Sequence, residues 1–332
     1  MSYDIDLIMP WVDGGDLNWQ KEKAQTLNIP DDNPEQGAIR YRDWDILKYW
    51  FRGVEKCLPW VRKVHFVTWG HLPEWLNVNA EKLNIVNHKD YIPEKYLPTF
   101  SANPIELNFH RIDDLAEHFI YANDDMFFIS PLSEEYFFKD GLPVDCCLEN
   151  AHQFFSGQID HMIGNDLAVI NKHFEKSKVL KEQKSKIFGL KQGVKPLLKN
   201  LYMKPFATFC GFYDFHTPYA YLKQTYRDVW DAEPELLDSV SSHKTRTSDD
   251  VNQWLFRYWQ FATGKFSPFG MNRGKFFSIG RDDAQIETVI KNRTLPMICL
   301  NDDDISVDFD KEKAFLIECF EKAFPEKSAF EK

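Results

Sequence analysis

No uninterrupted apolar run in the 332-residue sequence is long enough to span a bilayer. The apolar run near the N-terminus is flanked by acids and broken by a proline, so we expect no signal peptide. The six cysteines show no Cys-x-x-Cys spacing, and most lie in apolar contexts, which is typical of reduced core thiols in a cytosolic protein. Basic residues are fewer than acidic ones, 40 against 51, and the net charge of −11 argues against general nucleic-acid binding. These absences predict a cytoplasmic protein without a nucleic-acid partner.

The order of the apolar segments predicts an α/β fold. A chain of this length can bury a full core, as one large domain or as a domain with a sizeable insertion. Residues 43–58 place Ile46, Trp50 and Val54 on one face, as an amphipathic helix does, and Pro59 ends the pattern. Short apolar runs typical of strands lie at 5–9, 64–70, 83–86 and 144–148. Strands that alternate with helices in this way predict a mostly parallel sheet.

The central stretch of the chain is residues 119–129, an apolar run interrupted by Asn123-Asp124-Asp125. A polar turn between two apolar segments would give the same pattern. A second apolar run, 296–300, also ends on an amide and acids, beginning with Asn301 and Asp302. Two strands that each deliver such a group to a sheet edge predict two walls of one site. Carboxylate oxygens of this kind suit Mg²⁺ that carries phosphates.

A further candidate site follows the first strand, where Asp13 and Gly14 begin the run Asp-Gly-Gly-Asp. Glycine allows the backbone to approach a ligand closely. In open α/β sheets ligands bind at the carboxyl ends of the strands. An ordinary glycine turn is equally consistent with this run.

The segment that contains Glu106 reads first as a helix start. Asn103 is a suitable N-cap, Pro104 fits the first turn, and Glu106 stands where a capping-box acid would. Pattern alone therefore favours capping over chemistry for Glu106. His110 and Arg111 lie one turn further along.

Two segments in the last third combine basic residues with predicted helix starts. His216-Thr217-Pro218 is expected to open a helix, whose positive end would favour a neutral, proton-accepting His216. A structural histidine is the alternative. Arg246 precedes a predicted helix around residues 254–262, with Ser248 as its cap, and this position favours an anion site. A solvated loop is the alternative there.

Residues 172–204 differ in charge from the rest of the chain. Ten lysines, Lys172 to Lys204, stand against two glutamates, which gives a local charge of +8, and Val194, Leu197, Leu198 and Leu201 form an apolar stripe. Such a segment can lie on an anionic membrane or guide an anionic polymer. A solvated lysine face on an ordinary helix is the alternative.

Four ordered blocks together resemble the Stealth family. They are residues 5–14 (Ile-Asp-Leu-Ile-Met-Pro-Trp-Val-Asp-Gly), 42–128 (with Ile105-Glu106, His110-Arg111-Ile112 and Asn123-Asp124-Asp125), 216–246, and Leu300-Asn301-Asp302. The family comprises the sugar-1-phosphate transferases of bacterial capsule assembly and the eukaryotic lysosomal-enzyme GlcNAc-1-phosphotransferase. The resemblance covers most of the chain outside residues 133–205. Pro10 and the segment 101–104 depart from the commonest family form, and the second departure could alter specificity.

The resemblance implies a set of site residues. Glu106, Asp125, His216 and Arg246 fall on catalytic positions, and Asp13 falls on the acid of the first block. The implied substrate contacts are Asp13, Gly14, Arg111 and Asn123. Asp125 with Asp302 would hold Mg²⁺ or Mn²⁺.

The resemblance also implies a fold and a reaction. We expect one catalytic domain, 1–332, with a glycosyltransferase-A-like, mostly parallel sheet, flanking helices and a partly helical insertion at 133–205. A UDP-sugar would donate a hexose-1-phosphate, such as an N-acetylhexosamine-1-phosphate, to a hydroxyl of a polysaccharide or lipid-linked glycan, and UMP would leave. His216 is the expected base, with Glu106 orienting the acceptor or substituting for His216. The alternatives are an ordinary glycosyltransferase that releases UDP and a non-catalytic carbohydrate-binding protein. Peripheral membrane contact through Lys172–Lys204 is part of this expectation.

Overall fold

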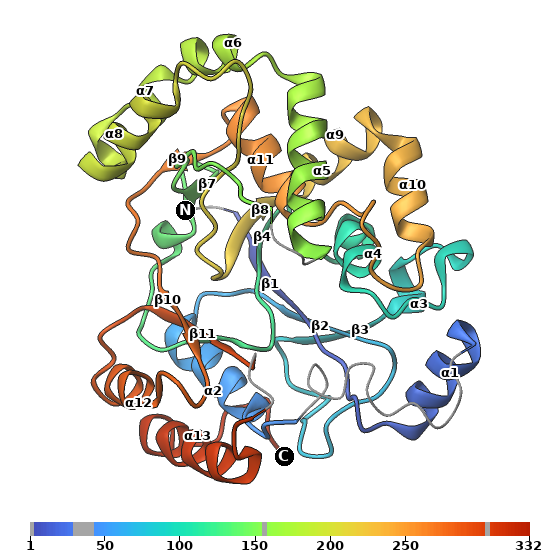
Figure 1. Cartoon of the computed structure of the whole chain (residues 1–332). Coiled ribbons are helices and arrows are strands. Elements are labelled where there is room, and N and C mark those ends of the chain that lie inside the picture. Colours follow the sequence, from blue (N-terminus) through green and yellow to red (C-terminus); the bar gives the residue numbers. More distant parts are fainter. Residues whose placement is uncertain (1–2, 29–42, 155–157, 303–305) are drawn as a thin grey trace.

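The computed structural model describes residues 3–28, 43–154, 158–302 and 306–332. Its centre is a five-stranded sheet of order β3-β2-β1-β4-β8 (Figure 1). Four strands run parallel, and β8 is antiparallel to β4. Their bounds are β1 Ile5–Pro10, β2 Val64–Thr68, β3 Leu83–Asn87, β4 His118–Tyr121 and β8 Tyr219–Leu222. The α/β class and the mostly parallel sheet are confirmed, and the strands predicted at 5–9, 64–70 and 83–86 are β1 to β3.

Two smaller sheets flank the central one. One has the order β10-β11-β5 and the other β6-β7-β9. Their bounds are β5 Met126–Phe128, β6 Phe138–Lys139, β7 Leu142–Asp145, β9 Ser267–Pro268, β10 Lys275–Ser278 and β11 Met297–Asn301. The stretch 119–129 is therefore two strands in two sheets, because the polar turn at residues 123–125 separates β4 from β5. The second apolar run is β11, which lies antiparallel to β5.

Helices cover both faces of the central sheet and form two hydrophobic cores. One core joins β1 and β2 to α2, α12, α13 and the sheet of β10, β11 and β5. The other joins β4 and β8 to α5, α9, α10 and α11. These helices are α2 Leu47–Cys57, α5 Gln158–His173, α9 Lys223–Ala232, α10 Pro234–Ser242, α11 Trp254–Thr263, α12 Asp283–Asn292 and α13 Phe309–Ala323. The remaining helices are α1 Leu17–Leu27, α3 His88–Tyr91, α4 Ala102–Leu107, α6 Lys176–Glu182, α7 Lys184–Ile187 and α8 Val194–Met203.

Several predicted boundaries were wrong for local reasons. The helix predicted from residue 43 starts at Leu47, because Asp45 takes a left-handed conformation with φ 56° and its N–H donates to Asp43. The strand predicted at 144–148 is β7 and ends at Asp145. His216–Pro218 leads into strand β8 rather than a helix. Ser248 does not cap α11, which begins at Trp254 and ends at Gly264 as predicted.

Residues 133–205 are partly helical, as predicted; their helices pack into the second core, and Phe137 and Phe138 belong to the first. Helix α5 lies against α11, and the buried Arg257 donates to Asp145 at 2.7 Å. That this segment is an insertion into the family fold stays a prediction. The six cysteines are all free thiols, and five of them are buried, in agreement with the predicted core thiols. Among the residues that the structure describes, no helix combines the length and the apolar character that crossing a membrane requires.

Candidate active site

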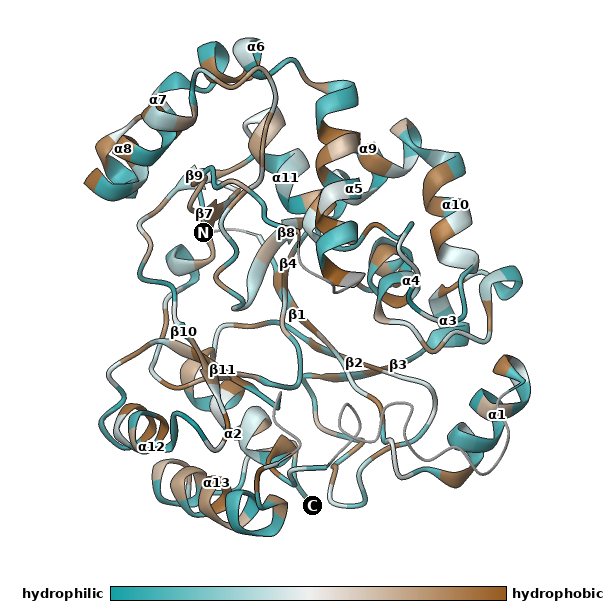
Figure 2. Cartoon of the chain, viewed as in Figure 1, coloured by the Kyte–Doolittle hydropathy of each residue, from teal (hydrophilic) through white to brown (hydrophobic). Residues whose placement is uncertain are grey.

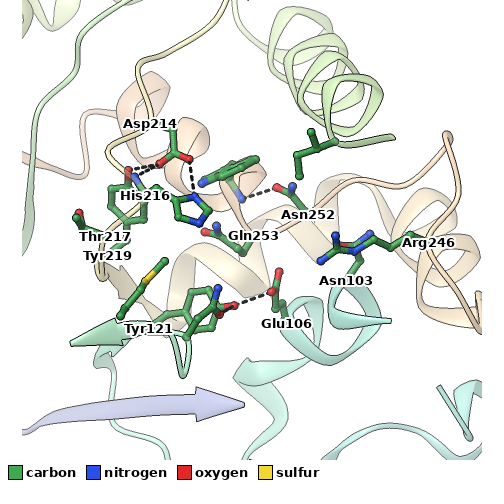
Figure 3. Close-up of a pocket in the computed structure, with 14 residues that line it drawn as sticks. Asn103, Glu106, Tyr121, Asp214, His216, Thr217, Tyr219, Arg246, Asn252 and Gln253 are labelled. Carbon is green, nitrogen blue, oxygen red and sulfur yellow. Dashed lines mark hydrogen bonds and ion pairs between the residues drawn. The ribbon is translucent and has the colours of Figure 1, made fainter. Parts of the chain in front are cut away.

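A pocket forms where three segments far apart in sequence meet (Figure 3). Helix α4 and the turn after β4 supply one wall, the residues leading into β8 a second, and the loop before α11 a third. The cavity has a volume of about 90 Å³. Its lining is rich in side chains that carry charge or hydrogen bonds: Asn103, Glu106, Tyr121, Asn123, Met126, Ile159, Asp214, His216, Thr217, Tyr219, Arg246, Asn252, Gln253 and Trp254. Three of the four predicted catalytic residues, Glu106, His216 and Arg246, are therefore brought together.

Glu106 is a buried carboxyl that faces the pocket from α4. It accepts a hydrogen bond from the Tyr121 hydroxyl at 2.6 Å, and that hydroxyl also contacts the Asn123 side chain. Burial raises the pKa of Glu106 to about 7, against the opposing effects of the Tyr121 hydrogen bond and the Arg246 charge. The capping interpretation was wrong, because the N-cap of α4 is Ser101, with no side-chain cap hydrogen bond. A carboxyl that titrates near neutrality suits proton transfer.

Arg246 reaches the pocket from the loop between α10 and α11, not from a helix start. This loop is organised by Asp250, which is fully buried. Asp250 accepts hydrogen bonds from Asn103 at 2.6 Å, from the Thr247 hydroxyl at 2.8 Å and from the Thr247 N–H at 3.2 Å, and it pairs with His243 at 2.7 Å. The contact between Asn103 and Asp250 joins α4 to the loop, so it connects the wall that carries Glu106 to the wall that carries Arg246.

His216 adopts a left-handed backbone conformation, with φ 49°, immediately before β8. Its Nδ1 lies 3.6 Å from an Asp214 oxygen, as the dashed line in Figure 3 marks. Burial lowers the pKa of His216, but the carboxylates of Asp214 and Asp125 outweigh burial, and the pKa is raised. The helix start predicted at His216 was therefore wrong, and the direction of the pKa shift is opposite to the one that a helix start would give. Its two acidic neighbours favour the imidazolium, a hydrogen-bond donor.

Asp125 lies in the turn between β4 and β5, beside β11. Its backbone carbonyl accepts the Leu300 N–H at 2.9 Å, and one carboxylate oxygen accepts the Cys299 thiol at 3.4 Å. The other oxygen, Oδ1, is inaccessible to solvent and has no hydrogen-bond partner among the described residues. Burial raises the pKa of Asp125, and the nearby His216 opposes the shift. An unpartnered carboxylate oxygen of this kind is costly unless a cation or donor completes it.

The donor set near Asp125 can be tested against a divalent cation. Ligand atoms of Asp125, His216 and Cys299 lie within 4.8 Å of one another. Burial raises the pKa of the Cys299 thiol, which donates to the Asp125 carboxylate at 3.4 Å. Hard Mg²⁺ prefers oxygen, and Asp302, which directly follows β11, brings a second carboxylate to the same sheet edge. The unpartnered Oδ1 of Asp125 and the carboxylate of Asp302, which follows Leu300 by two residues, are the oxygen ligands that suit Mg²⁺ or Mn²⁺.

The remaining predicted residues divide between the pocket and its surroundings. Asn123 lines the pocket. Asp13 and Gly14 follow β1, the strand beside β4. The Asp13 N–H donates to His71 at 2.7 Å. Asp13 and Gly14 do not line the pocket. Arg111 donates to Asn108 at 2.9 Å and lies over the Trp230 ring at 4.7 Å, also outside the lining.

Sequence reasoning missed several residues of the site. Tyr121 and Asp214 hold the two titratable groups Glu106 and His216, and Asp250 holds the Arg246 loop. An acid two residues before His216 was a visible signal for Asp214. No local pattern marks Tyr121, which reads as the end of a buried strand.

The chain matches one family model and is similar in sequence to polysaccharide phosphotransferases. Residues 40–144 match the family model described as Stealth protein CR2, conserved region 2. The chain is 40% identical over 332 residues to the capsular polysaccharide phosphotransferase WcwK of Streptococcus pneumoniae, covering 99% of this chain and 98% of the relative. It is 37% identical to the receptor polysaccharide phosphotransferase WefC of Streptococcus oralis over 98% of this chain and 99% of the relative. It is 36% identical to the exopolysaccharide phosphotransferase cps2G of Lactiplantibacillus plantarum over 99% of this chain and 97% of the relative.

Among solved structures, the apo WbbM bifunctional glycosyltransferase aligns with 97% of this chain and 52% of its own chain, at 9% identity and a TM-score of 0.39. Mouse xyloside xylosyltransferase 1 aligns with 89% of this chain and 97% of its own, at 12% identity and a TM-score of 0.34. Likeness at this level carries no conclusion about fold or function, so the glycosyltransferase-A-like topology stays a prediction.

Proposed function

Because the chain belongs to the Stealth family and is a phosphotransferase by its full-length relatives, we propose that it transfers a hexose-1-phosphate from a UDP-sugar to a glycan hydroxyl and releases UMP. An N-acetylhexosamine-1-phosphate is the proposed group. The observation that carries the proposal is the meeting of Glu106, Arg246 and His216 in one pocket, with the Asp125 turn beside it. Such a site offers a base, two cationic donors and a place for a diphosphate.

The proposed reaction is an attack by the acceptor oxygen on the phosphorus that carries the sugar. A new bond forms between that oxygen and phosphorus, and the phosphorus–oxygen bond to UMP breaks, so UMP keeps the bridging oxygen. Glu106 takes the hydroxyl proton, because its pKa of about 7 matches neutral operation. Arg246 and His216 hold the phosphoryl oxygens. Phosphoryl transfer needs chiefly positioning and charge neutralisation, and this arrangement supplies both.

Residues at the sheet edge would hold the donor. Asp125 and Asp302 would hold Mg²⁺ or Mn²⁺, and the bound ion would neutralise diphosphate charge. Asp13 and Gly14 follow β1 beside the β4 turn, where a nucleotide would lie at the carboxyl ends of the strands. Asn123 would contact the diphosphate or sugar. Arg111 is turned toward Trp230 and is left out of the proposed contacts.

The acceptor is proposed to be a growing polysaccharide or a lipid-linked glycan in capsular or exopolysaccharide synthesis, as the names of the relatives suggest. Nucleotide-activated donors place this reaction in the cytoplasm. A lipid-linked acceptor would bring the enzyme to the inner membrane face, with contact through the basic segment Lys172–Lys204.

The reaction class is tested by its products. We expect UMP in an amount equal to the product, and phosphorus NMR should show a diester coupled to the anomeric proton. The anomeric configuration of the donor passes unchanged into the product, because the bond between the anomeric carbon and its oxygen never breaks. A product without phosphorus, formed together with UDP, would make this an ordinary glycosyltransferase. Absence of turnover with every UDP-sugar and glycan tried would favour a carbohydrate-binding protein.

Replacing Arg246 with alanine should lower turnover by roughly 10²-fold, the usual scale for loss of one preorganised electrostatic group. Arg246→Lys should recover only part of the rate, because an ammonium lacks the bidentate geometry of guanidinium. Initial rates of UMP release check this, with circular dichroism to show that the fold is kept. Arg227→Ala is the matched control, since Arg227 is exposed and lies 3.8 Å from Glu117 in a surface ion pair. Near-normal rates for folded Arg246→Ala would remove Arg246 from the site.

A further inference from the structure

Helix α8 and its flanking residues present an unusual apolar surface, which we name the α8 surface: Leu190, Val194, Leu198, Leu201, Tyr202 and Phe206. Their exposed fractions run from 47% to 73%. Thirteen large apolar side chains are exposed among the described residues, and six of them fall within this short segment. Scattered exposed apolar residues are ordinary, but a contiguous cluster marks an interaction site. In Figure 2 hydrophobic colour is visible along α8 at the edge of the molecule.

The orientation of α8 is fixed by contacts on its opposite face. Asn200 is buried there, where it accepts the Glu149 N–H at 2.8 Å and donates to the Cys147 carbonyl at 2.8 Å. Pro196 and Met203 are buried on the same side. Surface helices ordinarily turn their apolar face inward. Here the buried face carries an amide with satisfied hydrogen bonds, so the apolar face is held outward.

The lysines of the segment divide into two groups. Lys176 is buried in an ion pair with Glu149 at 2.7 Å, and Lys186 donates to the carbonyls of Gly264 and Phe266. Lys172, Lys178 and Lys199 contact Glu233, Glu175 and Asn150. Five others are exposed and have no ion-pair partner among the described residues: Lys181, Lys184, Lys191, Lys195 and Lys204. Lys191, Lys195 and Lys204 alternate in sequence with the apolar residues of this segment, so these three charges border the α8 surface, whereas Lys181 and Lys184 lie on α6 and α7.

We propose that the α8 surface docks on an anionic bilayer. Its apolar side chains enter the boundary between headgroups and acyl chains, and the three bordering lysines bind lipid phosphates. Apolar side chains bordered by lysine are the composition that binds anionic interfaces. A second copy of the chain would set the same lysines against one another, which disfavours self-association through this surface. Docking would bring the enzyme to a lipid-linked acceptor, and in this respect the inference rests on the proposed function. The observations on the α8 surface do not depend on the pocket.

The test is co-sedimentation of the full chain with two kinds of vesicle, phosphatidylcholine alone and phosphatidylcholine with phosphatidylglycerol. Wild type should bind only the anionic vesicles. Leu198→Ser with Tyr202→Ser, and separately Lys191→Gln with Lys195→Gln, should each weaken binding at least roughly 10-fold. Leu17→Ser on α1, where the side chain is 78% exposed, and Lys313→Gln with Lys322→Gln on α13 are the matched controls, and both should bind as wild type does. Salt near 1 M shortens the Debye length to about 3 Å and should weaken attraction by the lysines.

Three results would overturn the proposal: no binding to anionic vesicles, equal binding to both kinds, or wild-type binding by both α8-surface variants. Sedimentation velocity without lipid tests whether the α8 surface binds a second copy of the chain instead. A wild-type dimer that the α8-surface variants abolish would assign the surface to self-association. UMP release with a soluble acceptor is measured in parallel. The variants should keep that activity, so failure to bind lipid and failure of the proposed reaction are separate outcomes.

Discussion

Replacing Asp125 with asparagine should lower turnover by about 10³-fold or more and leave the protein folded. The expected size is that of losing several kcal/mol of charge stabilisation at a metal-assisted phosphoryl transfer. Asparagine keeps the shape and can still accept the Cys299 thiol, but it removes the charge of a carboxylate whose Oδ1 has no partner. Because that unpartnered oxygen is a cost to the folded state, the free energy of unfolding should stay the same or rise.

The Asp125 prediction is checked by UMP release and by a readout that does not need turnover. Thermal shifts should show that Mg²⁺ or Mn²⁺ stabilises wild type in the presence of UDP and that Asp125→Asn loses this response. Asp124→Asn is the matched control, since it removes the adjacent carboxylate of the same turn and leaves Asp125 in place. If Asp124→Asn loses as much activity as Asp125→Asn, or if Asp125→Asn keeps the metal response, Asp125 is not the ligand.

Strands whose residues are buried along their whole length could be predicted from the sequence. The apolar runs that became β1 and β2 are almost fully buried between two layers, which is why they read as continuous strands, whereas the edge strand β3 is only partly buried. Residues 123–125 and 301–302 were expected to form two walls of one site, and the pairing of β5 with β11 brings those turns together. The burial of the Asp125 Oδ1 is not visible in the sequence, because it arises where the chain turns back into β5 directly after this residue.

Predictions failed where distant contacts overrode a local signal. Thr217-Pro218 is an acceptable helix start, but Tyr219–Leu222 pair with β4 and complete the central sheet, so the chain extends there. The Arg246 loop is likewise shaped by Asn103, which lies 147 residues before Asp250 in sequence. Arg111 could not be placed from sequence at all, because its orientation depends on Trp230, which lies on α9.

The exchange of roles between His216 and Glu106 follows from the same long-range contacts. Sequence favoured His216 as the base, with Glu106 orienting the acceptor or substituting for it. In the folded chain His216 lies near Asp214 and Asp125, whereas Glu106 is almost fully buried. Acidic neighbours favour a protonated histidine, and burial favours a carboxyl that holds its proton up to neutral pH. Burial and charge partners, which decide both pKa values, are properties of the fold.

Replacing Glu106 with glutamine should lower turnover by roughly 10³-fold, within the range found for loss of a positioned general base. The active form of a base is deprotonated. With a pKa of about 7 for Glu106, wild-type kcat/KM should fall as pH drops below about 7. The groups that interact with Glu106 are the Arg246 guanidinium, the hydroxyls of Tyr91, Tyr121 and Tyr226, and the buried acid Asp166. Glu106→Asp should keep part of the rate and an acidic limb, because it retains a carboxyl in the pocket.

Stability should move in the opposite direction to activity in Glu106→Gln. Burial raises the pKa of this carboxyl in the folded state from 4.5 to about 7, so folding favours the protonated form. Its contribution to stability is complete below pH 4.5 and is lost as pH rises through about 7. Glutamine carries no charge to bury and can still accept the Tyr121 hydrogen bond. Its free energy of unfolding at pH 8 should therefore exceed that of wild type by up to roughly 3 kcal/mol, and the difference should vanish toward pH 4.5. Denaturant unfolding at both pH values measures this, and a glutamine variant that is inactive but less stable at pH 8 would show a structural role for Glu106 instead of a base.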